Sequence, residues 1–183
     1  MSRAGKYPVK LSEGVVASIA EDKLVIKGPK GELAVPLNTK NAGLVDIKVE
    51  ADSIAVTPKD ADDKASSAMW GTMTRNIRNA VEGVTHGFAK EMRMNGVGYK
   101  ASVSGKKFTL VVGFSHDVVM EIPDGITVTM GETPTEFTIG GIDKCAVGLF
   151  ADKIHKIRKQ DPYKGKGIFY KSEKVRRKEG KKK

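Results

Sequence analysis

Apolar and polar positions follow the same order twice along the chain. Residues 24–37 and residues 109–122 each contain an apolar run, a glycine, an acidic residue four positions later and a second apolar run. Two apolar runs joined through a glycine are typical of a β-hairpin. Residues 47–49 and 126–128 then alternate as half-buried strands do. A further strand is predicted after each of these segments, around Ile54 and Val56 and around Phe137 and Ile139.

Each half then continues into a helical pattern. Its apolar residues lie at intervals of 3, 4 and 3 positions, and one glycine falls at the same place in both halves. The residues concerned are Trp70, Gly71, Met73, Ile77 and Ala80, and then Val147, Gly148, Phe150, Ile154 and Ile157. This spacing gives each helix one apolar stripe, which we expect to cover one face of a sheet. One of Asp60, Asp62 and Asp63 is expected to cap the first helix, and Asp143 the second.

The matching order predicts an α+β fold built from two tandem copies of a small domain, each with an antiparallel sheet and one helix. Both patterns are interrupted at residues 82–87, where we place the join between the copies. The expected divisions are a first repeat at residues 1–82, a second repeat at residues 83–160 and a basic C-terminal extension at residues 161–183.

The positive charge lies almost entirely at the C-terminus. The 183 residues include 32 Lys and Arg and 22 Asp and Glu, which gives a formal net charge of +10. Residues 153–183 alone carry 14 basic and 3 acidic residues, a net charge of +11, so the remainder is close to neutral. A basic tail on a balanced body is typical of polyanion-binding chains. Residues 162–170 interleave aromatic residues and glycines with lysines, which suits contacts with phosphate, sugar and base better than a solubility tail.

Few residues suggest catalysis, metal binding or membrane insertion. The single cysteine, Cys145, excludes an internal disulfide and a Cys-cluster metal site, and we expect its thiol to be buried. The three histidines do not form a metal-binding motif. No apolar run approaches the roughly 18 residues of a membrane helix. The first residues match no signal or transit peptide, so we expect a soluble cytosolic protein. The cysteine and histidine content predicts no metal site, and we expect no cofactor.

Two short motifs leave an enzymatic alternative to weigh. Gly96 and Gly98 fit the G-x-G-x-x-A fingerprint of dinucleotide-binding proteins, which requires a helix after the glycines. The following residues predict another hairpin instead, and this favours a glycine turn, although a nucleotide-dependent enzyme stays open as an alternative. Residues 115–117 read Ser-His-Asp, but adjacent residues point in different directions and do not make a catalytic triad. We expect them in a hairpin loop.

The basic tail also leaves two other binding classes open, a DNA-binding protein and a membrane-surface protein. Neither predicted helix shows a basic face for reading DNA. The glycines and Pro162 near the start of the tail disfavour the amphipathic basic helix that membrane binding requires.

Several segments resemble one family. Residues 162–170 read PYKGKGIFY, and a basic tail follows them. This C-terminal part of the chain resembles that of a ribosomal protein family, the sixth protein of the large subunit in bacteria. NGVGYKA from Asn95 and VGFSHDV from Val112 resemble its second domain, and IKGPKGEL from Ile26 resembles its first. The resemblance covers essentially the whole chain. Gln160 and Phe169 depart from the family pattern, in which a proline and a basic residue are usual.

The resemblance implies a non-enzymatic structural component of the large subunit of the cytoplasmic ribosome, monomeric rather than a homo-oligomer. It implies binding to 23S rRNA near the base of the acidic-protein stalk and the sarcin–ricin loop. Neighbouring large-subunit proteins and translational GTPases would lie close by.

We expect rRNA contacts mainly from the second repeat and the tail, with an affinity that falls steeply with salt. The expected rRNA-binding residues are Arg3, Lys6, Arg93, Tyr99, Lys100, Lys106, Lys107, His116, Tyr163, Lys164, Gly165, Lys166, Gly167, Tyr170, Lys171, Arg176, Arg177 and Lys178. The two tail glycines would let the backbone lie against RNA.

Overall fold

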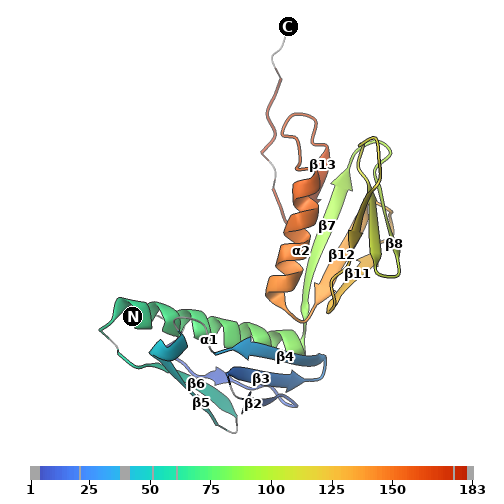
Figure 1. Ribbon diagram of the computed structural model, residues 1–183. Coiled ribbons are helices and arrows are strands. Elements are labelled where there is room, and N and C mark those ends of the chain that lie inside the picture. The colour runs from blue at the N-terminus through green and yellow to red at the C-terminus, as the bar shows by residue number, and fades with distance from the viewer. Residues whose placement is uncertain are drawn as a thin grey trace. The chain divides into compact units, whose positions relative to one another are not determined.

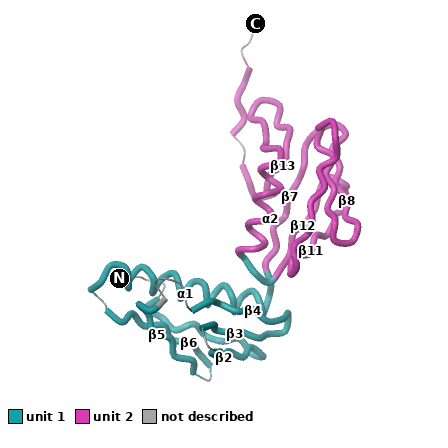
Figure 2. The backbone as a smooth tube through the Cα atoms, viewed as in Figure 1, with its two compact units in different colours: residues 1–87, 142–144 teal, residues 88–141, 145–183 magenta. Residues whose placement is uncertain are grey.

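The computed structural model describes residues 5–20, 22–37, 42–50, 52–60, 62–174 and 176–180. Arg3, one of the expected rRNA-binding residues, lies outside these ranges. The chain divides into two compact units, which Figure 2 shows in two colours. Unit 1 is residues 1–87 with residues 142–144, and unit 2 is residues 88–141 with residues 145–183.

Unit 1 has two antiparallel three-stranded sheets and one long helix (Figure 1). Its elements are β1 (Val9–Lys10), β2 (Val16–Ala20), β3 (Lys23–Gly28), β4 (Gly31–Pro36), the 3-10 turn η1 (Ala42–Leu44), β5 (Val45–Val49), β6 (Ser53–Pro58) and α1 (Lys64–Thr85). The sheets have the orders β1-β6-β5 and β2-β3-β4. The stripe residues Met73 and Ile77 of α1 are buried with Leu24, Ile26 and Ile54 from the strands. The apolar stripe therefore closes the core of this unit, as its spacing predicts.

Unit 2 repeats this plan and adds one strand. Its elements are β7 (Phe88–Asn95), β8 (Lys100–Ser104), β9 (Lys107–Val111), β10 (Val118–Glu121), β11 (Ile126–Met130), β12 (Glu136–Gly141), α2 (Lys144–Ile157) and β13 (Gly167–Tyr170). The sheets have the orders β10-β9-β8 and β11-β12-β7-β13, and all of these strand pairs are antiparallel. Val147, Phe150 and Ile154 of α2 lie in its core.

The duplicated α+β architecture is confirmed, strand by strand. The sheet β1-β6-β5 matches β7-β12-β11, the sheet β2-β3-β4 matches β8-β9-β10, and α1 matches α2. The hairpins predicted at residues 24–37 and 109–122 are β3–β4 and β9–β10, in antiparallel register. Within the described residues, β13 is the element of unit 2 without a counterpart in unit 1.

The two ends of α1 show what the sequence did and did not reveal. Asp63 caps the helix, because its carboxylate accepts hydrogen bonds from the backbone N–H groups of Ala65 and Ser66 at 3.2 and 3.0 Å. The helix then continues through Thr85, past Glu82, where its pattern was expected to stop. Val84 is completely buried, so packing against the core extends the helix by a further turn.

Two other expectations are settled by the structure. Gly98 has a φ of +77° and lies in the turn from β7 to β8, so the glycine pair makes a turn followed by a strand and not the helix of a dinucleotide site. Cys145 is exposed, and the prediction of a buried thiol is wrong. It precedes the stripe residue Val147 by two positions, about 200° around the helix, and therefore faces away from the core.

Candidate nucleic-acid interface

The segment KGKG and its neighbours form a closed loop after α2, which we call the basic loop (residues 161–167). The backbone N–H of Asp161 donates to the carbonyl of Lys166, and that of Gly165 donates to the carbonyl of Asp161, both at 2.8 Å. The side-chain amides of Asn95 and Gln160 both donate to the Gly165 carbonyl, at 2.9 and 3.1 Å. The loop backbone is therefore fixed to the end of β7 and to the residues that follow α2.

The Asp161 carboxylate holds the start of the basic loop. It accepts hydrogen bonds from the backbone N–H of Lys164 at 2.9 Å and of Tyr163 at 3.3 Å. These two bonds, that of Lys164 first, lower the pKa of the Asp161 carboxyl below its ordinary value. A tail with a large positive charge thus uses one of its few acids to shape its own backbone.

The two loop glycines are required by the protein itself. Gly165 has a φ of +71°, which favours glycine. At Gly167, with a φ of +142°, a Cβ would lie 2.6 Å from the Gln160 Cα and the Lys159 carbonyl oxygen. Both glycines are buried. The sequence pointed to them for close approach to RNA, whereas the structure uses them for close approach of two backbone segments.

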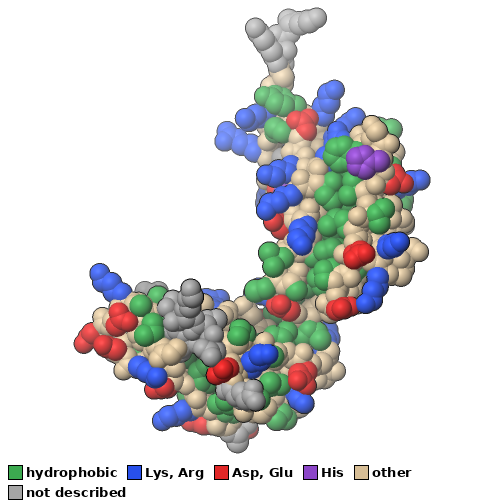
Figure 3. Space-filling model, in the orientation of Figure 1, with side chains coloured by type: hydrophobic (Ala, Val, Ile, Leu, Met, Phe, Trp, Pro, Cys, Tyr) green, Lys and Arg blue, Asp and Glu red, His purple; other side chains and the backbone are tan. Residues whose placement is uncertain are grey.

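The loop presents its long side chains to solvent. Tyr163 is 58% exposed, and Lys164 and Lys166 are exposed as well. Figure 3 shows Lys and Arg side chains projecting from the part of unit 2 that includes α2 and β13. A rigid backbone that displays one aromatic ring and two ammonium groups can contact phosphate, sugar and base at once.

Strand β13 connects the loop to the sheet and positions two further predicted residues. Its backbone pairs with β7, and Ile168 is completely buried. Tyr170 is half-buried against His155, with ring centroids 5.3 Å apart, and this burial raises the pKa of its hydroxyl. Lys171 is exposed, and its ammonium lies 3.0 Å from the Glu91 carboxylate, which raises the pKa of the lysine.

A second set of predicted residues surrounds Arg158, which the sequence did not single out. The Arg158 guanidinium donates to the carbonyls of Val112 and Gly113 at 2.8 and 3.2 Å. It also lies over the rings of Tyr99 and Phe114, at 5.8 and 5.3 Å from their centroids. Tyr99 is only 8% exposed beneath this guanidinium, so it supports the turn between β7 and β8.

The outer part of this cluster is accessible. Phe114 is 45% exposed, and the ring of His116 stacks on it with centroids 6.1 Å apart. His116 is exposed in the β9–β10 loop, as predicted for the Ser-His-Asp segment. In the sequence Arg158 is simply the first residue after the apolar stripe of α2. Its contacts with Tyr99 and Phe114 are visible only in the folded chain.

The described part of the tail returns to the basic loop. The backbone N–H of Lys178 donates to the carbonyl of Pro162 at 3.1 Å. Arg176, Arg177 and Lys178 are exposed, and Arg177 lies beside Gly165. Arg93 projects from β7, with its Nε 3.3 Å from the Glu136 carboxylate. The structure thus brings the tail residues, the basic loop and the end of β7 together.

The predicted lysines of β8–β9 lie at its two ends. Lys100 pairs with Val111 at the end near Tyr99 and Arg158, whereas Lys107 pairs with Ser104 at the opposite end, apart from this surface. Lys106, at that far turn, pairs with Asp124 at 2.7 Å, and the hydrogen bond raises the pKa of the lysine and lowers that of the aspartate. Lys6 is exposed and belongs to unit 1.

The described residues contain neither a metal-binding cluster nor a membrane-spanning helix. No group of three His, Cys, Asp or Glu side chains in this part of the chain could hold a metal ion. None of the described helices combines the length and the apolar character needed to cross a membrane.

Comparison with known proteins gives the same two-part division. A model of the ribosomal protein L6 family matches residues 11–87 and, separately, residues 95–171. The chain is 46% identical over 183 residues to the large ribosomal subunit protein uL6 of Mesorhizobium japonicum, with both chains fully covered. It is 48% identical over 185 residues to uL6 of Erythrobacter litoralis and 45% identical over 183 residues to that of Zymomonas mobilis, again over the full length of both chains. Since one family accounts for each repeat and its members match end to end, this chain belongs to the ribosomal protein L6 family, a family of ribosomal proteins and not of enzymes.

Proposed function

We propose that this protein is a structural component of the large ribosomal subunit that binds 23S rRNA through one end of unit 2. The observation that carries the proposal is the basic loop, whose hydrogen-bonded backbone displays Tyr163, Lys164 and Lys166 to solvent. It lies in the C-terminal segment of 31 residues that holds a net charge of +11. The names of the full-length relatives, all large ribosomal subunit proteins, support the assembly to which the loop would bind.

The mechanism is charge neutralisation on a preformed backbone. Basic side chains that replace condensed counterions on the rRNA release those ions, so the affinity falls steeply as salt rises. The phosphate-neutralising residues of this surface are Lys164, Lys166, Lys171, Arg176, Arg177 and Lys178. Lys171 exchanges its Glu91 partner for phosphate. The buried residues Tyr99, Gly165 and Gly167 hold the backbone of this surface in place. Two further rings that could contact the RNA are those of His116 and Tyr170.

The family resemblance suggests the location of this contact in the ribosome. We propose the base of the acidic-protein stalk close to the sarcin–ricin loop, in the cytoplasmic ribosome. Other large-subunit proteins would be its neighbours, and translational GTPases would dock nearby. Unit 1, whose residues 1–87 carry 12 basic and 11 acidic residues, would serve as a spacer or a platform toward these neighbours.

Co-sedimentation with large ribosomal subunits tests the proposal. The tagged full chain is expressed in cells, and the lysate is separated on sucrose gradients in low and in high salt. We expect the wild type in the large-subunit peak and the Lys164→Gln/Lys166→Gln variant to dissociate from it at lower salt. A wild-type chain that stays at the top of the gradient in low salt would overturn the ribosomal proposal.

A further inference from the structure

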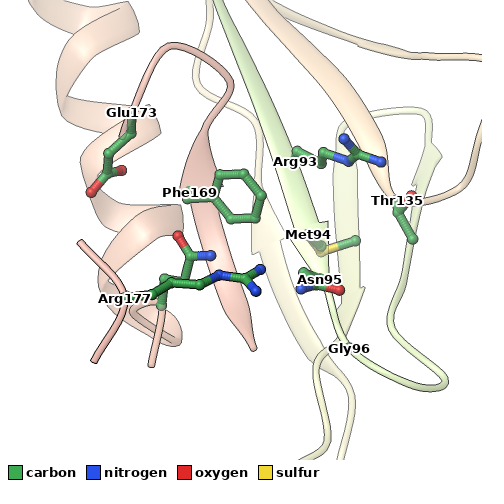
Figure 4. Close-up of a pocket in the computed structure, with 9 residues that line it drawn as sticks. Arg93, Met94, Asn95, Gly96, Thr135, Phe169, Glu173 and Arg177 are labelled. Atoms are coloured by element: carbon green, nitrogen blue, oxygen red, sulfur yellow. The ribbon is translucent and has the colours of Figure 1, made fainter. Parts of the chain in front are cut away.

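Beside the basic loop, unit 2 has an open groove of about 510 Å³. Figure 4 shows the Phe169 ring projecting into it, between Arg177 on one side and the β7 residues Arg93 and Asn95 on the other. Met94, Gly96, Thr135, Gln160 and Glu173 complete its lining. The groove therefore combines an aromatic ring with two guanidinium groups.

The strand register explains why Phe169 faces this groove. Phe169 pairs with Arg93, which in turn pairs with Glu136 on β12, so these three side chains form a row across one face of the sheet. The neighbouring residues Met94 and Ile168 point to the opposite face and are buried in the core. The Phe169 ring consequently lies on the outer face of the sheet, in a row whose other two members, Arg93 and Glu136, are charged.

Phe169 lies outside the core of unit 2. It is half-buried, yet it belongs neither to the core of unit 2 nor to the apolar residues that pack against that core. In the described part of the chain, no other aromatic ring contacts it. An aromatic ring in such a position offers a flat apolar face to a ligand.

The charges in the groove favour an anionic ligand. Arg93 is paired with Glu136, and the Glu173 carboxylate accepts a hydrogen bond from the backbone N–H of Tyr170 and lies 3.8 Å from His155. Arg177 differs, because no described carboxylate lies within 4 Å of its guanidinium. It lies against Gly165 of the basic loop, next to the surface proposed to bind RNA. A guanidinium of this kind suits a phosphate.

We propose that the groove binds one unstacked nucleotide of the RNA, with its base on the Phe169 ring and a phosphate on Arg177. Single-stranded RNA is recognised by proteins in this way, with bases stacked on aromatic rings and phosphates held by basic side chains. The inference rests on the proposed function, because the nucleotide is part of the bound rRNA. It adds a stacked base beside the contacts that the basic loop offers.

Three variants of the full chain separate stacking from packing. Phe169→Tyr keeps the ring, so we expect it to restore the affinity that removal of the ring loses. Phe169→Leu keeps an apolar side chain but removes the flat ring, and we expect its affinity to fall about tenfold. Arg177→Gln is expected to weaken binding and to reduce the slope of log K against log salt by about one. Equal affinities for the leucine variant and the wild type would overturn the stacking contact.

Two measurements on the complex locate the nucleotide. Chemical probing should show one base whose protection is lost with Phe169→Leu while the other protections persist. Irradiation of the wild-type complex at an ultraviolet wavelength, followed by nuclease digestion and mass spectrometry, should give a nucleotide adduct on the peptide that contains Phe169. This second measurement needs no variant, so it decides the question even if the leucine variant fails to fold.

The two proposals fail in different ways. If the wild-type chain binds 23S rRNA and protects it, but gives no adduct on this peptide and loses no protection with Phe169→Leu, the groove is not a nucleotide site and the proposed function stands. If the wild-type chain shows no salt-dependent binding to 23S rRNA, the proposed function fails and the groove proposal fails with it.

Discussion

The two units have the same elements in the same order but differ at one edge of one sheet. In unit 1, β1 has 2 residues and forms the edge of the sheet β1-β6-β5. In unit 2 the matching strand, β7, has 8 residues and lies between β12 and β13. The additional strand comes from the C-terminal segment. Unit 2 thus gains a covered edge and, with it, a fixed origin for the basic tail.

The half of the chain that has the additional strand is also the more basic one. Residues 1–87 carry 12 basic and 11 acidic residues, whereas residues 88–183 carry 20 basic and 11 acidic residues. The scaffold itself is not more basic in the second copy, since the excess lies from residue 153 onward. Unit 2 thus combines the shared plan with an additional strand and a basic tail, and the proposed RNA-binding surface lies on these two additions.

The largest effect is expected from the core residue of the added strand. Ile168 is completely buried, so Ile168→Ala should lower the free energy of unfolding of unit 2 by about 2–5 kcal/mol. The only tryptophan, Trp70, lies in α1 of unit 1. In urea, the tryptophan fluorescence transition should stay in place while the part of the circular dichroism transition that belongs to unit 2 moves to lower urea.

Ile168→Val is the matched control, with an expected cost of about 0.5–1.5 kcal/mol. If Ile168→Ala moved the fluorescence transition as far as the circular dichroism transition, the two units would unfold together. The strand could then not be assigned to the stability of unit 2 alone.

A smaller loss of stability is expected where Gly167 of the basic loop packs against the backbone of Lys159 and Gln160. Gly167→Ala would place a Cβ 2.6 Å from the Gln160 backbone at a φ of +142°, and we expect a loss of roughly 2 kcal/mol or more. Gly98→Ala is the control, because its φ is +77° but nothing lies within 4 Å of the added Cβ, and only backbone strain of about 1–2 kcal/mol is expected. Thermal unfolding compares the two variants, and equal losses would contradict the crowding at Gly167.

The smallest effect concerns the Asp161 carboxylate. Its pKa is lowered in the folded protein, so its hydrogen bonds stabilise the loop above the unfolded-state pKa of about 3.9, and this contribution is lost as the pH falls through the folded-state pKa. In an NMR titration from pH 6 to pH 2, the backbone amide signal of Lys164 should shift with a midpoint below 3.9. Asp161→Asn should abolish this shift, and a midpoint at or above 3.9 would contradict the hydrogen-bonded loop.

The local patterns of the sequence predicted the repeat, because hairpins and helix stripes depend on residues close together in the chain. Strand β13 was missed, since its pairing partner β7 lies about 70 residues earlier and GIFY is a short apolar run among lysines. Cys145 could have been placed correctly, because its offset from Val147 already puts it off the stripe.

The candidate surface was predictable in composition but not in geometry. The sequence indicated Tyr163, Lys164 and Lys166, and the structure displays all three on one loop. The sequence could not indicate that the Arg158 guanidinium lies over the Tyr99 ring, because that contact joins a turn to the residue after a helix nearly 60 positions later. Nor could it separate Lys106 and Lys107 from the surface, since only the strand register puts them at the far end of β8–β9.

The salt dependence of 23S rRNA binding by two charge-matched double variants would show whether the basic loop binds the RNA. Lys164→Gln/Lys166→Gln and Lys106→Gln/Lys107→Gln each remove two positive charges, the first pair from the basic loop and the second from the far turn. We expect the loop variant to lower the slope of log K against log salt by about two and the far-turn variant to leave it unchanged. Equal reductions by both variants would mean that total charge, and not the surface at the end of unit 2, binds the RNA.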